Sequence, residues 1–425
     1  GYCMDRRLDP AIQGFWMTNE RMDFDVVVVG GGIVGLASAY KITLSHPDIR
    51  VGVLEKEDKL AAHQTGHNSG VIHSGLYYAP GSTKAQTCIQ GRKELVAFAK
   101  KHQIPHEICG KIIVATRESE LGDIERIYNN AVQSNIEGVE KIGPDEIKEI
   151  EPSCQGIAGL QVPCTGIIDF TKVAEKLGEL VAEKGNGNQV LTSHEVRGFD
   201  KHDFYTKVVT NRGVFAARYI INCAGLQCDR VARLDSVSPG MRIVPFRGDY
   251  YELTEKAKEK VKALIYPAPD PALPFLGVHF TRTIDGLVEC GPNAVFSFKR
   301  EGYGKTDFSW PDTWDSLSYP GLWRLFLRYW RYGLGEYVRA FSRKLFLRQL
   351  QRLVPSLQDE DIKPCKAGVR AQALDRNGRL IDDFRIERHR NSLHVLNAPS
   401  PAATASLAIG GHINQIATEY FRLKD

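Results

Sequence analysis

The stretch FDVVVVGGGIVG, residues 24–35, decides the fold of this chain. Its first six residues form a nearly continuous apolar run, which is typical of a parallel strand buried on both faces. The next six, from Gly30 to Gly35, fit the pattern G-x-G-x-x-G. A helix is predicted to begin within them and to end before Pro47. This order of strand, glycine-rich turn and helix predicts a dinucleotide-binding unit.

A second strand, VGVL at residues 51–54, ends at Glu55, twenty residues after Gly35. At that spacing an acidic side chain reaches the ribose hydroxyls of a bound dinucleotide. Gly30 permits the tight turn, Gly32 lets the backbone approach the pyrophosphate, and Gly35 lets helix and strand pack closely. The helix N-terminus stabilises the phosphate charge. A glycine-rich turn in an α/β domain that binds nothing is the alternative.

Length and composition indicate a soluble globular enzyme of two or three domains. The chain has 425 residues, 43% hydrophobic and 25% charged, with a net charge of +4. That charge is small for this length, and no nucleic-acid partner is expected. The nine cysteines include no C-x-x-C pair, so no metal site is expected. No apolar run is long enough for a membrane-spanning helix.

The choice between NAD and FAD depends on segments that return to the same domain later in the chain. An NAD dehydrogenase normally keeps its Rossmann domain contiguous. Here IINCAG at 220–225 is a short apolar strand that ends in a turn of small residues, preceded by a hairpin-like stretch from 193. Near the end, VLNAPSPAAT at 395–404 precedes a predicted helix. Its small residues and Thr404 suit a loop whose backbone amides face a flavin.

These features resemble the glutathione-reductase-type FAD proteins, above all the D-amino-acid oxidase branch with glycine oxidase, sarcosine oxidase and glycerol-3-phosphate dehydrogenase. Four blocks are similar to the L-2-hydroxyglutarate dehydrogenase family within that branch: TGHNSGVIHSG at 65–75, VPFRGDY at 244–250, GVHFT at 277–281 and AGVRAQALD at 367–375. The resemblance spans nearly the whole chain. It implies an α/β fold, in which a glutathione-reductase-type FAD-binding Rossmann domain carries an inserted antiparallel-sheet substrate domain.

The resemblance also implies the reaction, in which L-2-hydroxyglutarate is oxidised to 2-oxoglutarate by hydride transfer to flavin N5. FAD is expected to bind noncovalently, because no cysteine stands where sarcosine oxidases link their flavin. The expected cofactor-binding residues are Gly30, Gly32, Ile33, Val34, Gly35, Glu55, Lys56, Gly66, His67, Asn68, Ser69, Gly70, Val71, Val196, Cys223, Ala224, Gly225, Gly368, Pro401, Ala402, Ala403 and Thr404.

Two domains and an N-terminal arm are predicted, and both domains are discontinuous. The arm is residues 1–23. The FAD-binding domain is expected to comprise residues 24–105, 165–235 and 360–425, and the substrate domain residues 106–164 and 236–359.

The reaction needs a cation for the C1 carboxylate, a base for the hydroxyl proton, and a polar or cationic group for the distal carboxylate. Arg370 is the expected carboxylate clamp, because a guanidinium binds a carboxylate through two parallel hydrogen bonds. A surface arginine is the alternative. Gln372, on the same face if this segment is a strand, is expected to assist. Tyr77 and Tyr250 are further substrate-binding candidates, although a structural role suits Tyr77 equally well.

His279 is the predicted base, because the ordinary pKa of histidine lies near neutrality. A histidine that is satisfied within the core is the alternative, and His73 is the second candidate base. Arg247 is a candidate for binding the distal carboxylate. A salt bridge from Arg247 to Asp249 is an equally good reading of that residue.

A basic segment at 322–357 holds eight Lys and Arg residues and a single acid, Glu336. Its apolar residues alternate with arginines at helical spacing, which suits a helix lying on an anionic membrane. A helix packed over the sheet is the alternative. The apolar residues are Leu322, Trp323, Leu325, Phe326, Tyr329 and Trp330, and the arginines are Arg324, Arg328 and Arg331.

The resemblance implies that electrons pass to a membrane quinone or flavoprotein, and that the protein is mitochondrial and peripheral on the inner membrane. Two other functions stay open. One is an amine or amino-acid oxidase of the same fold that uses oxygen. The other is a flavin-bound, membrane-associated scaffold without turnover.

Overall fold

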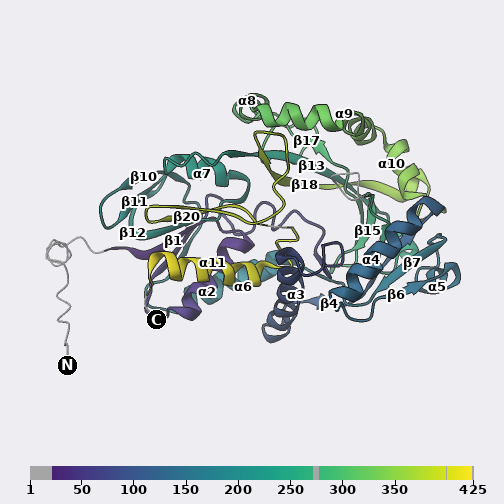
Figure 1. The fold of residues 1–425 in the computed structure, drawn as a ribbon, viewed down its shortest axis with the longest axis horizontal. Coiled ribbons are helices and arrows are strands. Elements are labelled where there is room, and N and C mark those ends of the chain that lie inside the picture. The colour runs from purple at the N-terminus through teal and green to yellow at the C-terminus, as the bar shows by residue number, and fades with distance from the viewer. Residues whose placement is uncertain (1–21, 271–276, 399, 424–425) are drawn as a thin grey trace.

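The computed structural model describes residues 22–270, 277–398 and 400–423, and its elements form two large sheets with helices packed on them (Figure 1). Most of the predicted N-terminal arm, 1–23, lies outside the described residues, as do residues 271–276. The eight-stranded sheet contains β1 (Phe24–Val29), β2 (Val51–Leu54), β9 (Gln189–Leu191), β10 (Val196–Lys201), β11 (Thr206–Thr210), β12 (Gly213–Asn222), β19 (Arg385–His389) and β20 (Ser392–Asn397).

The predicted strand, turn and helix are present, because β1 leads through the glycines into α2 (Ile33–Ser45). The side chains of β1 alternate between two cores: Val26 and Val28 pack under the helices, and Val27 and Val29 pack on the other face of the sheet. Burial on both faces explains the continuous apolar run. The helices on the first face are α2, α3 (Thr83–Lys101), α6 (Phe170–Glu183) and α11 (Ser406–Phe421), and α7 (Cys228–Leu234) packs on β10 and β20.

The nine-stranded sheet is antiparallel except where β14 pairs with β5. It contains β5 (Lys111–Ala115), β6 (Glu140–Ile142), β7 (Ala158–Val162), β13 (Met241–Leu253), β14 (Leu264–Pro267), β15 (His279–Arg282), β16 (Val288–Gly291), β17 (Val295–Phe296) and β18 (Ile362–Asp375). A three-stranded sheet of β3 (Val71–Ile72), β8 (Gly166–Ile168) and β4 (His106–Glu107) is the third. Helices α4 (Leu121–Gln133), α5 (Pro144–Ile150), α8 (Trp310–Leu317), α9 (Pro320–Phe341) and α10 (Arg343–Leu350) accompany these sheets, with short 3-10 turns at Glu118–Glu120, Gly225–Gln227, Lys258–Lys260 and Asp359–Asp361.

The structure differs from the predicted domain division at residue 360. Strand β18 pairs with β13 along its whole length, from Ile362 opposite Leu253 to Asp375 opposite Met241. It therefore belongs to the nine-stranded sheet and not to the FAD-binding segment in which it was expected. The long β13 needs a partner of matching length, and only tertiary pairing reveals which segment supplies it.

Helix α9 follows α8 along one outer edge of the molecule, over β13 and β17 (Figure 1). Leu322 and Leu325 are buried in a core that includes Val244 of β13. Trp323 and Trp330 point outward, with exposed fractions of 52% and 57%. The helix thus packs over the sheet, and its apolar residues do not share one face as predicted. At 3.6 residues per turn they form two stripes, one buried and one exposed.

In the part of the chain that the structure describes, no helix is both long enough and apolar enough to cross a membrane.

Candidate active site

The expected cofactor-binding segments meet at one edge of the eight-stranded sheet. Strands β20, β12, β1 and β2 are parallel neighbours, so their carboxyl ends lie at the same edge. There β1 leads into Gly30, β2 into Glu55 and β12 into Cys223, and β20 runs into the loop that holds Thr404. The carboxyl edge of such a sheet is where nucleotides bind.

The glycines of the motif fit the roles that the sequence predicted. Gly30 has φ +116°, and a Cβ on it would lie 2.4 Å from the carbonyl oxygen of Cys223. A Cβ on Gly35 would lie 2.2 Å from the carbonyl oxygen of Gly30. At Gly32 a Cβ would meet only the hydroxyl of Thr65, at 3.4 Å, and this hydroxyl also accepts a hydrogen bond from the Ile33 amide at the start of α2. The glycines therefore leave room for a pyrophosphate to approach the backbone at the N-terminus of α2.

Glu55 is buried beside the glycine turn. Its Oε2 accepts a hydrogen bond from the Gly31 amide at 2.7 Å, and its Oε1 accepts one from the Glu57 amide at 2.8 Å. Each carboxylate oxygen has a further lone pair, so Glu55 fits a ribose hydroxyl as well. The neighbouring Lys56 forms ion pairs with Glu57 and Glu301 at 2.8 and 2.7 Å. These ion pairs already engage the ammonium group that we expected to contact the cofactor.

Residues 65–70 link the glycine motif to the nine-stranded sheet. Thr65 Oγ1 accepts a hydrogen bond from the Ile33 amide at 3.0 Å, and the side chain of Asn68 accepts one from the Gly70 amide at 2.8 Å. His67 Nδ1 lies 3.2 Å from the carbonyl oxygen of Ala367. The segment therefore lies between the predicted cofactor edge and β18. Gly66 and Ser69 belong to it, and Gly368 packs against the backbone of His67.

The C-terminal loop is joined to β3 by a buried hydroxyl. Thr404 Oγ1 donates a hydrogen bond to the carbonyl oxygen of Val71 and accepts one from the His73 amide, both at 3.1 Å. This hydroxyl ties loop to strand, which is a structural use that the sequence did not predict. The other expected contacts from the loop are the half-buried Pro401, Ala402 and Ala403. At the same edge lie Ala224 and Gly225, and Val196 packs against the hydrophobic cluster that includes Leu54.

Four of the expected substrate and catalytic residues lie on one face of the nine-stranded sheet. Side chains alternate along a strand, and directly paired residues point to the same side. Ile112, Ile265 and Phe280 are paired across β5, β14 and β15, and they face a core under α10. The residues next to them face the opposite side. That opposite face carries Lys111, Tyr266, His279, Tyr250, Arg370 and Gln372.

His279 stands near the middle of this face and is 6% exposed. Its Nδ1 lies 2.9 Å from the carbonyl oxygen of Gly277, and its ring stacks on Tyr266 at 4.1 Å between centroids. A carbonyl oxygen only accepts hydrogen bonds, so Nδ1 carries the hydrogen and Nε2 of the neutral ring keeps a lone pair. Burial, together with the charges of Arg370 and Lys111, lowers the pKa of His279 to about 4, and the hydrogen bond to Gly277 opposes this shift.

His73 belongs to the same cluster. Burial lowers its pKa to about 3, and the nearby Lys111 and His279 contribute to that shift. Both candidate bases are therefore neutral at pH 7, and the structure brings them together without choosing between them. Tyr250 lies near Arg370, and burial raises its pKa to about 12.

Arg247 lies on the face of β13 opposite to Arg370. Its Nε donates a hydrogen bond to Asp249 at 2.8 Å, and its Nη1 donates one to the carbonyl oxygen of Gly304 at 2.7 Å. The side chain is 5% exposed. The salt bridge that the sequence offered as an alternative for Arg247 is therefore the arrangement that the structure contains.

Lys111 is a residue of this site that the sequence analysis missed. It is 3% exposed, and its Nζ lies over the rings of Tyr77 and Tyr266, 4.7 and 4.6 Å from their centroids. Burial lowers its pKa to about 8. The signal was present, because a lysine opens an otherwise apolar strand, KIIVA at 111–115.

Comparison with known proteins connects this arrangement to a chemistry. Residues 25–416 match the family model described as FAD dependent oxidoreductase. The chain belongs to this family. The match confirms the predicted fold class and the predicted use of FAD, and it covers both large sheets.

Members of the family that resemble the chain include L-2-hydroxyglutarate dehydrogenase of Indibacter alkaliphilus, 48% identical over 94% of this chain and 100% of the relative. The mitochondrial L-2-hydroxyglutarate dehydrogenase of Homo sapiens is 43% identical over 94% of this chain and 90% of the relative. Among solved structures, L-alpha-glycerophosphate oxidase of Mycoplasma pneumoniae has a TM-score of 0.74 at 23% identity, covering 93% of this chain and 94% of the other. This last likeness concerns the fold.

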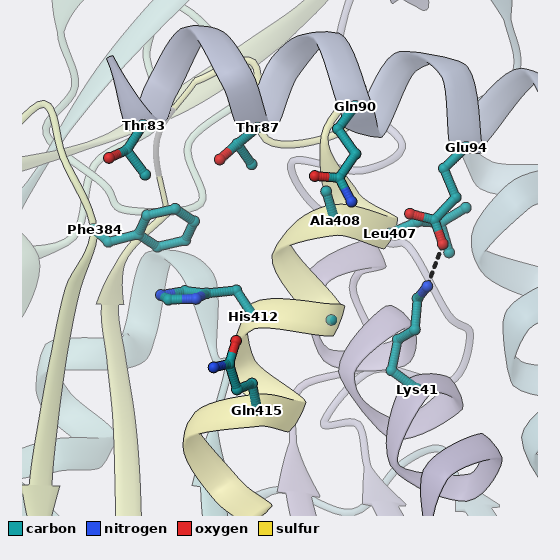
Figure 2. A pocket seen from close by; sticks show the side chains of 11 residues that line it. Lys41, Thr83, Thr87, Gln90, Glu94, Phe384, Leu407, Ala408, His412 and Gln415 are labelled. Carbon is teal, nitrogen blue, oxygen red and sulfur yellow. Dashed lines mark hydrogen bonds and ion pairs between the residues drawn. The ribbon is translucent and has the colours of Figure 1, made fainter. Parts of the chain in front are cut away.

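A hollow of about 290 Å³ on the helical side lies apart from these family features (Figure 2). It is formed by α2, α3, α11 and the chain at Phe384, and its lining includes the ion pair of Lys41 with Glu94. His412 and Gln415 reach into it from α11 (Figure 2). None of the residues that line it belongs to the predicted cofactor or substrate sets, so we do not place the active site there.

Proposed function

We propose that this protein oxidises L-2-hydroxyglutarate to 2-oxoglutarate with noncovalently bound FAD. The observation that carries the proposal is the shared sheet face on which Arg370 and the neutral His279 lie together. An α-hydroxy acid presents a carboxylate next to the hydroxyl that must lose its proton, and these two side chains match those two groups. The likeness to L-2-hydroxyglutarate dehydrogenases supports the choice of substrate.

Each residue has a role in this proposal. Arg370 binds the C1 carboxylate, with Gln372 beside it, and Tyr77 and Tyr250 line the substrate site. Nε2 of His279 accepts the proton of the C2 hydroxyl, and His73 is the second candidate for that role. FAD would be held by the glycine turn, Glu55 and the segments at the carboxyl edge. When bound, FAD supplies the two-electron acceptor for the hydrogen on C2.

The test is an assay of the purified holoenzyme with L-2-hydroxyglutarate and an artificial electron-accepting dye. In parallel, a panel of amino acids and amines is assayed with detection of peroxide. We expect dye reduction with the hydroxy acid, and bleaching of the yellow flavin when this substrate is added without oxygen. Turnover of amines or amino acids alone would establish the oxidase alternative. A flavin that no substrate bleaches would establish the scaffold.

We also propose that the protein lies on a membrane surface and passes its electrons to a membrane quinone or flavoprotein. The support is the outer side of α8 and α9, where Trp310, Trp314, Trp323, Leu327 and Trp330 are all more than half exposed. Tryptophan prefers the membrane interface, and neighbouring arginines such as Arg331 favour anionic lipid. A location at the mitochondrial inner membrane is proposed from the relatives named as mitochondrial, although bacterial relatives also exist.

A further inference from the structure

The second carboxylate of the proposed substrate needs a cation, and Arg247 does not supply it. The guanidinium of Arg247 faces the other side of the sheet, where Asp249 and Gly304 hold it. The face that carries His279 also carries Arg370 near one end and Lys111 near the other, while Arg242, which register places on the same side, is paired with Asp315. If Arg370 binds the C1 carboxylate, Lys111 is the cation on this face for which an anionic partner has to be found.

Lys111 is a buried cation without a counter-ion. In the described segments of the chain its Nζ has no hydrogen-bond partner and no ion pair with a carboxylate. The groups whose charge would stabilise it are the thiols of Cys88 and Cys164, and burial raises the pKa of both thiols, so they stay neutral. Tyr77 and Tyr266 offer the faces of their rings. An ammonium group kept from water without an anion is costly, which indicates that an anion completes the site.

The hydroxyl of Tyr77 is a second buried polar atom beside Lys111 without a hydrogen-bond partner among the described residues. Burial raises the pKa of Tyr77 well above its ordinary value, so the phenol keeps its hydrogen and acts as a donor. A buried ammonium and a buried phenol, both donors, lie on one side of His279. A carboxylate oxygen is an acceptor for both.

The order of the groups along the sheet matches the order of groups along the substrate. Arg370 lies on β18, His279 on β15 and Lys111 on β5, and β15 stands between the other two strands in the sheet. L-2-hydroxyglutarate has its C1 carboxylate, its C2 hydroxyl and its C5 carboxylate in the same sequence. The ring of Tyr266 contacts both Lys111 and His279, so apolar surface for C3 and C4 adjoins the two groups.

We propose that Lys111, with the Tyr77 hydroxyl, binds the distal carboxylate and makes the enzyme selective for a dicarboxylate over a monocarboxylate. This inference rests on the proposed function for the identity of the substrate. It makes Lys111 a specificity-determining residue, whose contribution depends on the second carboxylate and not on the chemistry at C2.

Calorimetric binding of glutarate and of butyrate to the holoenzyme tests the proposal, because both lack the hydroxyl and neither is turned over. The wild-type protein should bind glutarate about 100-fold more tightly than butyrate, as expected for a charged hydrogen-bonded pair. Lys111→Met should abolish this preference and leave butyrate binding unchanged. Arg370→Met should weaken the binding of both ligands. Retention of the preference in Lys111→Met, or an equal loss for both ligands, would overturn the assignment.

Two controls separate specificity from folding. Lys141→Met removes another lysine that lies over a tyrosine ring, Tyr128 at 4.6 Å, but from an exposed position, and it should change neither affinity. Lys111→Arg keeps the charge and should keep most of the preference. The Tm of Lys111→Met should not fall, because methionine replaces an unpaired buried charge. A large fall in Tm together with an unchanged preference would assign Lys111 a structural role.

Kinetics with L-2-hydroxyglutarate and L-2-hydroxybutyrate complete the experiment. In the wild-type protein kcat/KM should favour the dicarboxylate by the same factor, and Lys111→Met should lose it through KM. If the wild-type protein oxidises neither acid but still prefers glutarate through Lys111, the proposed function fails and the binding site stands. If it oxidises both acids equally well, the proposed function stands and the inference fails.

Discussion

Arg247 and Arg370 lie on paired strands, and their positions show how a single side chain acquires or loses a role. Arg370 is opposite Phe246 in the register of β13 and β18, so Arg247, the next residue of β13, points to the other face. From the sequence, both were arginines in strands of mixed character, and each was a reasonable ligand for a carboxylate. Register separates them, and register depends on pairing between segments more than a hundred residues apart.

The pH dependence of turnover should report the burial of His279. Its pKa of about 4 in the folded protein means that the ring loses its ability to accept a proton only when the pH falls through that value. We expect the acidic limb of kcat/KM to lie near pH 4 to 5, well below the ordinary pKa of histidine near 6.5. Steady-state assays of the holoenzyme between pH 4 and 9 measure it.

Two histidine variants accompany this profile. His279→Asn should lower kcat by about 10² to 10⁴-fold, the usual contribution of a general base, and should remove the limb. His412→Asn, in the hollow between the helices, should leave the profile unchanged. Near-normal turnover of His279→Asn would transfer the role to His73, and an acidic limb near pH 6.5 would contradict the buried, neutral state of the ring.

At the scale of elements, the sequence predicted what depends on neighbours in the chain. The strand β1, the glycine turn and helix α2 were predicted because a buried apolar run and a glycine pattern are local signals. The arrangement of apolar residues on α9 was predicted only in part. Helical spacing indicated an amphipathic helix, but Leu322 and Trp323 could not be assigned to different faces until the sheet beneath them was known.

Lys111 was missed for a related reason. A single lysine at the start of a strand is usually solvent-exposed, and burial of this one depends on Tyr77 and Tyr266, which come from distant segments. The glycine motif could be interpreted alone because its neighbours in sequence are also its neighbours in space. The substrate face could not, because it takes its residues from separate strands.

Membrane binding by α8 and α9 can be tested on two exposed tryptophans. Trp314 and Trp330 are 72% and 57% exposed. The double variant Trp314→Ser, Trp330→Ser should therefore keep its Tm and its dye-linked activity. It should lose roughly tenfold or more of its affinity for vesicles that contain anionic lipid, measured by flotation, because two large apolar side chains no longer enter the interface. Phe204→Ser, at an exposed position in the eight-stranded-sheet half, is the control, and equal flotation of all three proteins would contradict the proposal.

At the scale of the whole molecule, a buried ion pair joins the two halves that the sequence treated as separate domains. Arg300 is fully buried and follows β17 of the nine-stranded sheet. Its Nη2 donates to Asp229 of α7 at 2.9 Å and to Asp315 of α8 at 2.7 Å. Asp229 also accepts a hydrogen bond from the Ile243 amide of β13 at 3.1 Å. These bonds fix α7, which packs on the eight-stranded sheet, to the nine-stranded sheet.

Breaking this pair should destabilise the whole protein in a pH-dependent way. Arg300→Met leaves the carboxylate of Asp229 buried without its main partner, which costs about 3 to 5 kcal/mol, whereas Arg197→Met, in an exposed pair with Glu195, should cost at most about 1 kcal/mol. In the wild-type protein burial opposes ionisation of Asp229, but the bonds and charge of Arg300 more than offset it and lower its pKa. Without Arg300, burial is opposed only by the charge of Arg233 and the hydrogen bond from the Ile243 amide, and because burial is the largest single influence we expect the folded-state pKa of Asp229 to rise above the unfolded value.

The variant should then lose stability as the pH rises from 5 to 8, the opposite of the effect of a paired carboxylate. Denaturant unfolding of the holoenzyme at both pH values measures this, and adding Asp229→Asn to Arg300→Met should remove the pH dependence. A destabilisation that is the same at both pH values would show that lost packing, and not the unpaired charge, is what Arg300 prevents.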